Sequence, residues 1–268
     1  MKVDAIAFDL DDTLLRDDRT ISPFTLSVLR RAAERGIRVI PASGRTRDSM
    51  GGFVDQIGCA SCFISCNGAE VWSPDRRLLM QELLDVPLAV EIARFAEERG
   101  CYAQTYAGDS FYYNQESEWA RAYAESSSLK GVYVGDLTAY IARPTPKILM
   151  MDTPERVASL LREAQGLFAG RVTLTCSKPY FLEANPLRAT KGNALRWCGG
   201  QLGFAMENVL AFGDSLNDLS MLTAVGYGVA VANAREDVKA QLTLACGSNE
   251  TDGPAHYIER HILSGGNA

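Results

Sequence analysis

Apolar runs alternate with a helical pattern over the first part of the chain. Residues 3–8 and residues 37–42 are runs of β-branched and apolar side chains. Between them, Ser22 offers an N-cap, Pro23 follows in the first turn, and apolar side chains then recur at helical spacing. A third run, residues 62–65, is followed by an Asn-Gly hairpin signal. Apolar strands separated by helices are typical of a parallel sheet that is covered on both faces.

The same alternation returns near the C-terminus. Residues 209–212 form an apolar strand that ends at Gly213, a helical pattern covers residues 219–222, and a further strand covers residues 227–231. We therefore expect the two ends of the chain to share one doubly wound α/β sheet.

The middle of the chain has a different pattern. A helix is expected to begin at Pro87, and a hairpin is expected over residues 101–113. Two further strands, residues 147–151 and 172–176, flank another helix. This succession is typical of an α+β unit that interrupts the doubly wound one. The expected domains are a core made of residues 1–82 and 186–268 and an inserted α+β domain over residues 83–185.

The composition narrows the class of protein. Of the 268 residues, 47% are apolar and 22% are charged, which is close to the globular average. The formal net charge of −6 repels phosphate backbones, so nucleic acid is not expected as a partner. No apolar run approaches the roughly 20 residues that span a bilayer, and the start of the chain does not resemble a signal peptide. Seven cysteines cannot all pair within one chain, so we expect reduced thiols and a cytoplasmic location. Because no apolar run is long enough to span a bilayer, we also expect no membrane partner.

Aspartates follow two of the expected strands. Asp9 and Asp11 come directly after residues 3–8, and Asp214 follows residues 209–212. Because open α/β sheets bind ligands at the carboxyl ends of their strands, we expect these three carboxylates to converge. Such a cluster requires a cation, and an all-oxygen donor set favours Mg²⁺. Aspartates that only cap helices and turns are the alternative, which does not explain several of them at two separate strand ends.

Ser43 and Lys191 point to a phosphate ligand. Ser43 ends the second strand at an expected helix start, where its hydroxyl and free backbone N–H groups would form an anion site. An ordinary N-cap serine is the alternative. Lys191 follows Thr190, a candidate N-cap, so its cation opposes the helix macrodipole unless an anion shares the position. A solvated surface lysine is the alternative. By the dipole alone, removal of this charge should stabilise the fold slightly.

Together these residues resemble the motifs of the haloacid dehalogenase-like superfamily. Asp9-Leu-Asp-Asp-Thr13 is similar to the DxDxT signature of the superfamily, and Gly213-Asp-Ser-Leu-Asn-Asp218 is similar to its fourth motif. Ser43 and Lys191 stand in the positions of the second and third motifs. The long insertion between these two is similar to the Cof-type subfamily. The resemblance covers essentially the whole chain and implies a Rossmann-like core with an inserted cap domain.

The resemblance also implies a role for each motif residue. Asp9 would be a nucleophile that forms an aspartyl-phosphate, and Asp11 would act first as an acid and then as a base. Arg188 occupies a slot where a small or apolar residue is expected, which implies a change at the phosphate end of the pocket. The ligands of Mg²⁺ would be Asp9, Asp11 through its carbonyl, Asp214 and Asp218. The phosphoryl oxygens would be held by Ser43, Gly44, Lys191 and Asn217.

The implied activity is that of a Mg²⁺-dependent phosphatase of small phosphorylated metabolites, with sugar phosphates as the first expectation. The insert would be a lid over the site, in which one or two of its many aromatic side chains line the substrate pocket. A phosphomutase with the same aspartate chemistry and a catalytically inactive phosphate-binding module are the alternatives. Asp11 argues against a module that only binds, since binding requires no second carboxylate. A dehalogenase would need neither Asp11 nor the metal aspartates.

The cysteines and histidines of the chain are not expected to hold a metal. Cys59, Cys62 and Cys66 lack a fourth zinc ligand, and we interpret them as buried thiols, with Cys62 and Cys66 on one face of a strand. His256 and His261 are five residues apart and do not share a helix face well.

Overall fold

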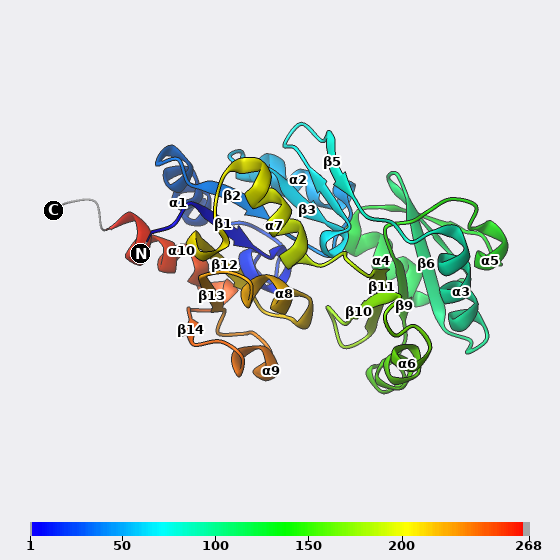
Figure 1. The fold of residues 1–268 in the computed structure, drawn as a ribbon. Helices are drawn as coiled ribbons and strands as arrows, with labels where there is room; N and C mark the ends of the chain where they lie inside the picture. Colours follow the sequence, from blue (N-terminus) through cyan, green and yellow to red (C-terminus); the bar gives the residue numbers. More distant parts are fainter. Residues whose placement is uncertain (1, 265–268) are drawn as a thin grey trace.

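A five-stranded parallel sheet forms the centre of the computed structural model, which describes residues 2–264. The strand order is β14-β13-β12-β1-β2 (Figure 1). From β1 the chain adds β2 on one side of the sheet, and later adds β12, β13 and β14 in turn on the other side. The direction of addition therefore reverses between β1 and β12, and sheets of this kind bind ligands at such a point. The strands are β1 (Ala5–Phe8), β2 (Arg38–Pro41), β12 (Val209–Gly213), β13 (Tyr227–Ala230) and β14 (Leu244–Ala245).

Helices cover both faces of this sheet, which confirms the doubly wound α/β fold. Ile6 and Phe8 pack on one side with apolar residues of α1, α2 and α10, whereas Ala5 and Ala7 pack on the other with those of α7, α8 and α9. The two-residue alternation of β1 thus separates two apolar layers. These helices are α1 (Pro23–Glu34), α2 (Arg47–Ile57), α7 (Lys191–Leu202), α8 (Leu219–Leu222), α9 (Glu236–Lys239) and α10 (Gly253–Ile258).

A small antiparallel sheet continues from the end of β2. It consists of β3 (Phe63–Ser65), β4 (Glu70–Trp72) and β5 (Leu78–Gln81), and the expected hairpin joins the first two. A bridge between Ala42 and Ile64 links it to the central sheet.

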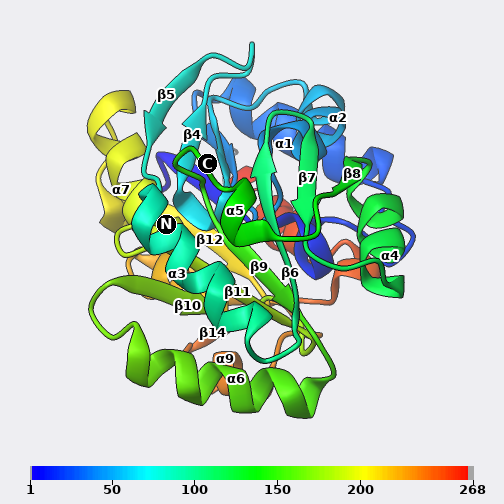
Figure 2. The same cartoon turned by 90° about the vertical axis from the view of Figure 1, so that its right-hand side faces the viewer.

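The segment between β5 and α7 forms a second sheet of six strands, ordered β10-β11-β9-β6-β7-β8. Helices α3, α5 and α6 cover one face (Figure 2). A cluster of aromatic side chains, together with residues of α4, packs on the other. The strands are β6 (Tyr102–Ala107), β7 (Ser110–Tyr113), β8 (Lys130–Tyr133), β9 (Ile148–Met151), β10 (Val172–Thr175) and β11 (Phe181–Pro186). The helices are α3 (Val86–Glu97), α4 (Glu118–Ser127), α5 (Leu137–Tyr140) and α6 (Pro154–Leu167).

Hydrogen bonds connect this second unit to the loop after β2. The guanidinium of Arg45 donates to the carbonyl of Ser126 at the end of α4, and the ammonium of Lys147 donates to the carbonyl of Gly44. The division of the chain at residues 83 and 185 remains a prediction. None of the helices in the described part of the chain has the length and apolar composition needed to cross a membrane.

Candidate active site

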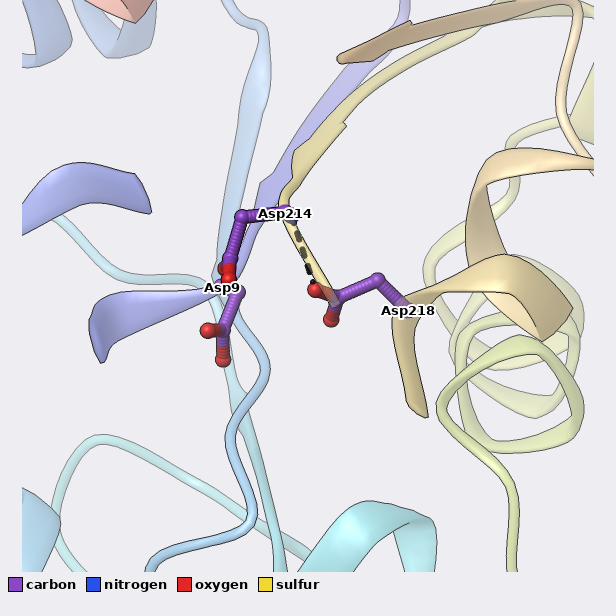
Figure 3. A group of neighbouring side chains, drawn as sticks. All are labelled: Asp9, Asp214 and Asp218. Carbon is purple, nitrogen blue, oxygen red and sulfur yellow. Dashed lines mark hydrogen bonds between the residues drawn. The ribbon is translucent and has the colours of Figure 1, made fainter. Parts of the chain in front are cut away.

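Three aspartates meet at the carboxyl ends of β1 and β12. Asp9 follows β1, Asp214 follows β12, and Asp218 lies in the turn after it (Figure 3). Each contributes one carboxylate oxygen to a group whose members lie within 4.8 Å of one another, and all three residues are buried. The structure therefore brings together three of the four residues expected to hold a metal.

The turn after β12 explains the position of Asp218. Its Oδ2 accepts hydrogen bonds from the backbone N–H groups of Asp214 and Ser215, each at 3.0 Å. A side chain at Gly213 would bring its Cβ to within 2.8 Å of the Asp218 carboxylate, so this close approach requires glycine. The fourth motif is thus a compact loop whose own backbone fixes a carboxylate.

Lys191 is the counter-ion of this group. It is the first residue of α7, its side chain is 0% exposed, and its Nζ lies 2.5 Å from Asp9 Oδ1 and 2.6 Å from Asp218 Oδ1. The alternative of a solvated surface lysine is therefore wrong. Thr190 is the N-cap, as expected, with its hydroxyl accepting from the backbone N–H of Asn193. Two carboxylates offset the repulsion between the ammonium and the helix N-terminus.

The remaining charge of the group is negative. Burial, with the nearby charges of Asp218, Asp214 and Asp11, raises the pKa of Asp9 well above its ordinary value, although Lys191 opposes this shift. Burial and the charge of Asp218 raise the pKa of Asp214 to about 7, against hydrogen bonds from Ser215 and Thr13. Three carboxylates that share a single ammonium leave an excess of buried negative charge. A hard divalent cation would neutralise it, and the all-oxygen donor set fits Mg²⁺.

Asp11 points to a different partner. Arg45 holds both of its carboxylate oxygens, through Nε at 2.8 Å and Nη2 at 2.7 Å. Burial alone would raise the pKa of Asp11, but the hydrogen bond and charge of Arg45, together with the charges of Lys178 and Lys191, outweigh it and keep this pKa below its ordinary value. The Asp11 side chain lies outside the group of three aspartates. This role of Arg45 was not anticipated from the sequence.

Ser43 is buried, but it does not lie at a helix start. Helix α2 begins at Arg47, and Thr46 is its N-cap, with its hydroxyl accepting from the backbone N–H of Ser49. The expectation of a helix N-terminus at Ser43 is therefore wrong, because Ser43 belongs to a separate loop after β2. Its Oγ accepts a hydrogen bond from the backbone N–H of Arg45 at 3.1 Å.

Asn217 is linked to this loop through Asn67. Its Nδ2 donates to Asn67 Oδ1 at 3.0 Å, and a Cβ on Gly44 would meet the same Asn67 oxygen at 3.0 Å. Asn67 lies in the β3–β4 turn in a left-handed conformation, with φ of 58°. The neighbouring Gly68 is needed because a Cβ there would lie 2.2 Å from the Thr190 carbonyl oxygen. The hairpin turn therefore packs directly on the start of α7.

A cavity of about 310 Å³ opens between these loops and the second sheet. Lys191, Asp218 and the exposed Arg188 are not among the residues that line it. Arg188 is therefore not part of the cavity wall, and its expected effect on the phosphate end of the pocket stays a prediction. From the core, the lining includes Asp9, Asp11, Ser43, Gly44, Arg45, Asp214 and Asn217. From the second unit, it includes Trp119, Tyr123, Lys147, Lys178, Tyr180, Phe181 and Glu183.

Most of the lining from the second unit was not identified from the sequence. Trp119 and Tyr123 are aromatic side chains of the insert, the kind expected to line the pocket, whereas Lys147, Lys178 and Glu183 gave no motif signal. Tyr180 stacks on Trp119, with 5.7 Å between the ring centroids. These residues form a mixed wall of rings and charges opposite the aspartates.

The cysteines form no metal site within residues 2–264, where the aspartate group is the only cluster of its kind. Cys62 and Cys66 are buried thiols, as expected, whereas Cys59 is only half-buried. Cys66, however, lies in the turn after β3 and not on the strand.

Comparisons with known proteins agree on one family. A family model described as haloacid dehalogenase-like hydrolase matches residues 6–258. Phosphatase YwpJ of Bacillus subtilis (strain 168) is 31% identical, with 96% of this chain and 99% of YwpJ covered. Pyridoxal phosphate phosphatase YbhA of Escherichia coli (strain K12) is 29% identical, with 98% of this chain and all of YbhA covered. A solved haloacid dehalogenase-like hydrolase from B. subtilis superposes with a TM-score of 0.87 at 28% identity, covering 97% of this chain and 100% of that one.

Proposed function

The chain belongs to the haloacid dehalogenase-like hydrolases, and we propose that it hydrolyses small phosphorylated metabolites, sugar phosphates first, through a phosphoaspartate on Asp9. It is an enzyme of the phosphatase class, as its named relatives are. One observation carries the proposal: Asp9 and Asp11 line the same cavity, and the buried ammonium of Lys191 contacts the Asp9 carboxylate. The odd number of free cysteines supports a cytoplasmic location.

In the first proposed step, a carboxylate oxygen of Asp9 attacks phosphorus. The new bond joins this oxygen to phosphorus while the bond from phosphorus to the leaving oxygen breaks. Asp11, in its protonated form, gives its proton to the leaving oxygen, so the organic product departs as an alcohol. Lys191 lies 2.5 Å from Asp9 Oδ1 and fixes the orientation of the nucleophile.

In the second step, Asp11 accepts a proton from water. The water oxygen bonds to phosphorus, the bond to Asp9 breaks, and inorganic phosphate is released. The contact with Arg45 favours the carboxylate form of Asp11, which suits this role as a base, so the protonation that the first step needs requires this contact to loosen when substrate binds. Arg45 is thus a positioning residue for the acid–base group.

The phosphoryl group is proposed to bind between Ser43, Gly44 and Asn217, with Lys191 nearby. The first three line the cavity from two different loops, beside Asp9. Mg²⁺ would be held by Asp9, Asp214 and Asp218, with the carbonyl of Asp11 as a further ligand. When bound, it would offset the repulsion between the Asp9 carboxylate and an anionic phosphate.

Removal of metal is expected to abolish activity. With EDTA present, hydrolysis of p-nitrophenyl phosphate should fall to background, because the buried carboxylates then repel the substrate. Addition of Mg²⁺ in excess of the chelator should restore the rate. Full activity in EDTA, with no metal detected in the protein by elemental analysis, would refute the metal assignment.

The inserted unit, proposed as a cap over residues 83–185, is expected to select the substrate. The aspartates fit any phosphoryl group, whereas the wall around Trp119 and Tyr180 faces the organic part. A panel of sugar phosphates and other small phosphorylated metabolites should therefore show preferred substrates, measured as kcat/KM for phosphate release.

Substitution of the cap wall tests this assignment. Tyr180→Ala should lower kcat/KM for the best metabolite more than for p-nitrophenyl phosphate, while Tyr133→Ala, on the exposed side of β8, should change neither. Equal losses with both substrates would show that the wall does not select. A chain that interconverts sugar phosphates in a bisphosphate-dependent manner, with little phosphate release, would be a phosphomutase.

A further inference from the structure

Lys147 is a buried lysine of the proposed cap that reaches into the core. It directly precedes β9, and its side chain is only 3% exposed. Its Nζ donates to Glu183 Oε1 on the neighbouring strand β11 at 2.6 Å, and to the carbonyl oxygen of Gly44 at 2.8 Å. The ammonium also lies 5.1 Å from the centre of the Tyr106 ring. One buried charge therefore connects the cap sheet with the loop that lines the phosphate end of the cavity.

The ion pair within the cap does not require the contact with Gly44. Glu183 neutralises Lys147, and its second oxygen accepts from the hydroxyl of Ser177 at 2.7 Å. A buried ion pair is by itself weak evidence for a contribution to stability, since apolar replacements are often neutral or better. The contact between Lys147 and Gly44 is therefore the part of this arrangement that needs a separate explanation.

The core holds the neighbouring carbonyl groups of the loop but not that of Gly44. The carbonyl of Ser43 accepts from the backbone N–H of Asn67, and that of Arg45 accepts from the backbone N–H of Cys66. The carbonyl between them, that of Gly44, accepts from Lys147 of the cap. The carbonyl of this one peptide unit is thus held by the cap.

That peptide unit also controls the hydroxyl of Ser43. A trans peptide directs its C=O and N–H to opposite sides, so a bond that fixes the carbonyl of Gly44 also fixes the N–H of Arg45. This N–H donates to Ser43 Oγ at 3.1 Å. Because Ser43 Oγ already accepts there, its own proton is directed elsewhere, and within residues 2–264 it is donated to no protein group. Lys147, the Gly44–Arg45 peptide and Ser43 therefore form a chain of hydrogen bonds, in which each bond polarises the next.

We propose that Lys147 is a positioning residue through which the closed cap orients the hydroxyl of Ser43 toward a phosphoryl oxygen. This inference rests on the proposed role of Ser43 in phosphate binding. Closure of the cap then does more than exclude water, because it completes the phosphate site. An open cap, which breaks the contact between Lys147 and Gly44, has a weaker site for phosphate.

A double-mutant cycle tests the relay, by which we mean the chain of hydrogen bonds from Lys147 through the Gly44–Arg45 peptide to Ser43. The variants are Lys147→Met, which is always made together with Glu183→Gln so that no buried charge loses its partner, Ser43→Ala, and their combination, and all are compared with the unaltered chain. Each protein, with Mg²⁺ present, is measured for its inhibition constant for inorganic phosphate, for kcat and KM with p-nitrophenyl phosphate, and for thermal unfolding. Lys130→Met, an exposed lysine of β8 in the same sheet, serves as the control that should change nothing.

The relay predicts non-additive effects. Lys147→Met and Ser43→Ala should each weaken phosphate binding about tenfold, the size expected for a lost hydrogen bond to a charged group. The combined variant should be little weaker than Ser43→Ala alone. Additive losses, or an unchanged inhibition constant in a folded Lys147→Met protein, would overturn the inference. If Ser43→Ala alone has no effect on phosphate binding, the proposed role of Ser43 fails first, and the relay fails with it.

Discussion

Asp9→Asn is expected to lower turnover on the order of 10⁶-fold, to the detection limit, because an amide cannot attack phosphorus in place of the carboxylate. The fold should survive the change. Burial raises the pKa of Asp9, so its charge is costly in the folded protein, and the substitution removes one of three crowded carboxylates. Kinetics and thermal unfolding of the same preparation should therefore show a folded and inactive protein.

Asp11→Asn is the matched control for this prediction. It removes an acid–base group, which typically contributes about 10²–10⁴-fold, and the loss should be smallest for substrates with a good leaving group. Because the second step then lacks its base, this variant should accumulate a phosphoenzyme that can be trapped by acid quench, whereas Asp9→Asn should form none. Near-normal turnover of Asp9→Asn would refute the covalent mechanism.

Lys191→Met is expected to remove activity and to lower the free energy of unfolding by about 3–5 kcal/mol. The ammonium is fully buried between Asp9 and Asp218, so its loss leaves two buried carboxylates without their counter-ion. This reverses the expectation from the helix dipole alone, which predicts a slight gain in stability. Chemical denaturation in EDTA measures the effect without compensation by a metal.

A second substitution separates the charge effect from the loss of packing. Lys191→Met combined with Asp218→Asn removes one uncompensated carboxylate and should recover part of the lost stability, while activity stays absent. If the single variant is as stable as the wild type, the ion pairs do not support the fold. If it also keeps its kinetics, Lys191 has no role in the site.

The local sequence predicts much of what positions the site. The caps Ser22 and Thr190 each accept the expected backbone hydrogen bond, and the apolar runs before Asp9 and Asp214 are buried strands of one sheet. These features depend on residues that are close in the chain. The acidic motifs could be located for the same reason, since each one directly follows its own strand.

The sequence could not predict what depends on distant residues. Several polar residues between β2 and α2 can act as an N-cap, and the local pattern does not distinguish Ser43 from Thr46. The contact between Lys147 and Gly44 joins residues 103 positions apart and leaves no periodic signal. Strand β8, largely exposed at the edge of its sheet, lacks the apolar alternation that identifies other strands.

The pairing of β1 with β12 also determines when the site can form during synthesis. Ala5 lies beside Val209 and Phe8 beside Phe212, so the central sheet closes only after most of the chain has left the ribosome. The six strands of the second sheet all lie between residues 102 and 186, and several pair with a near neighbour in the chain. Contacts of this kind form early because their loops are short. A nascent chain can therefore fold its second sheet first, and Asp9 gains its neighbours Asp214 and Asp218 only after that part of the chain has been synthesised.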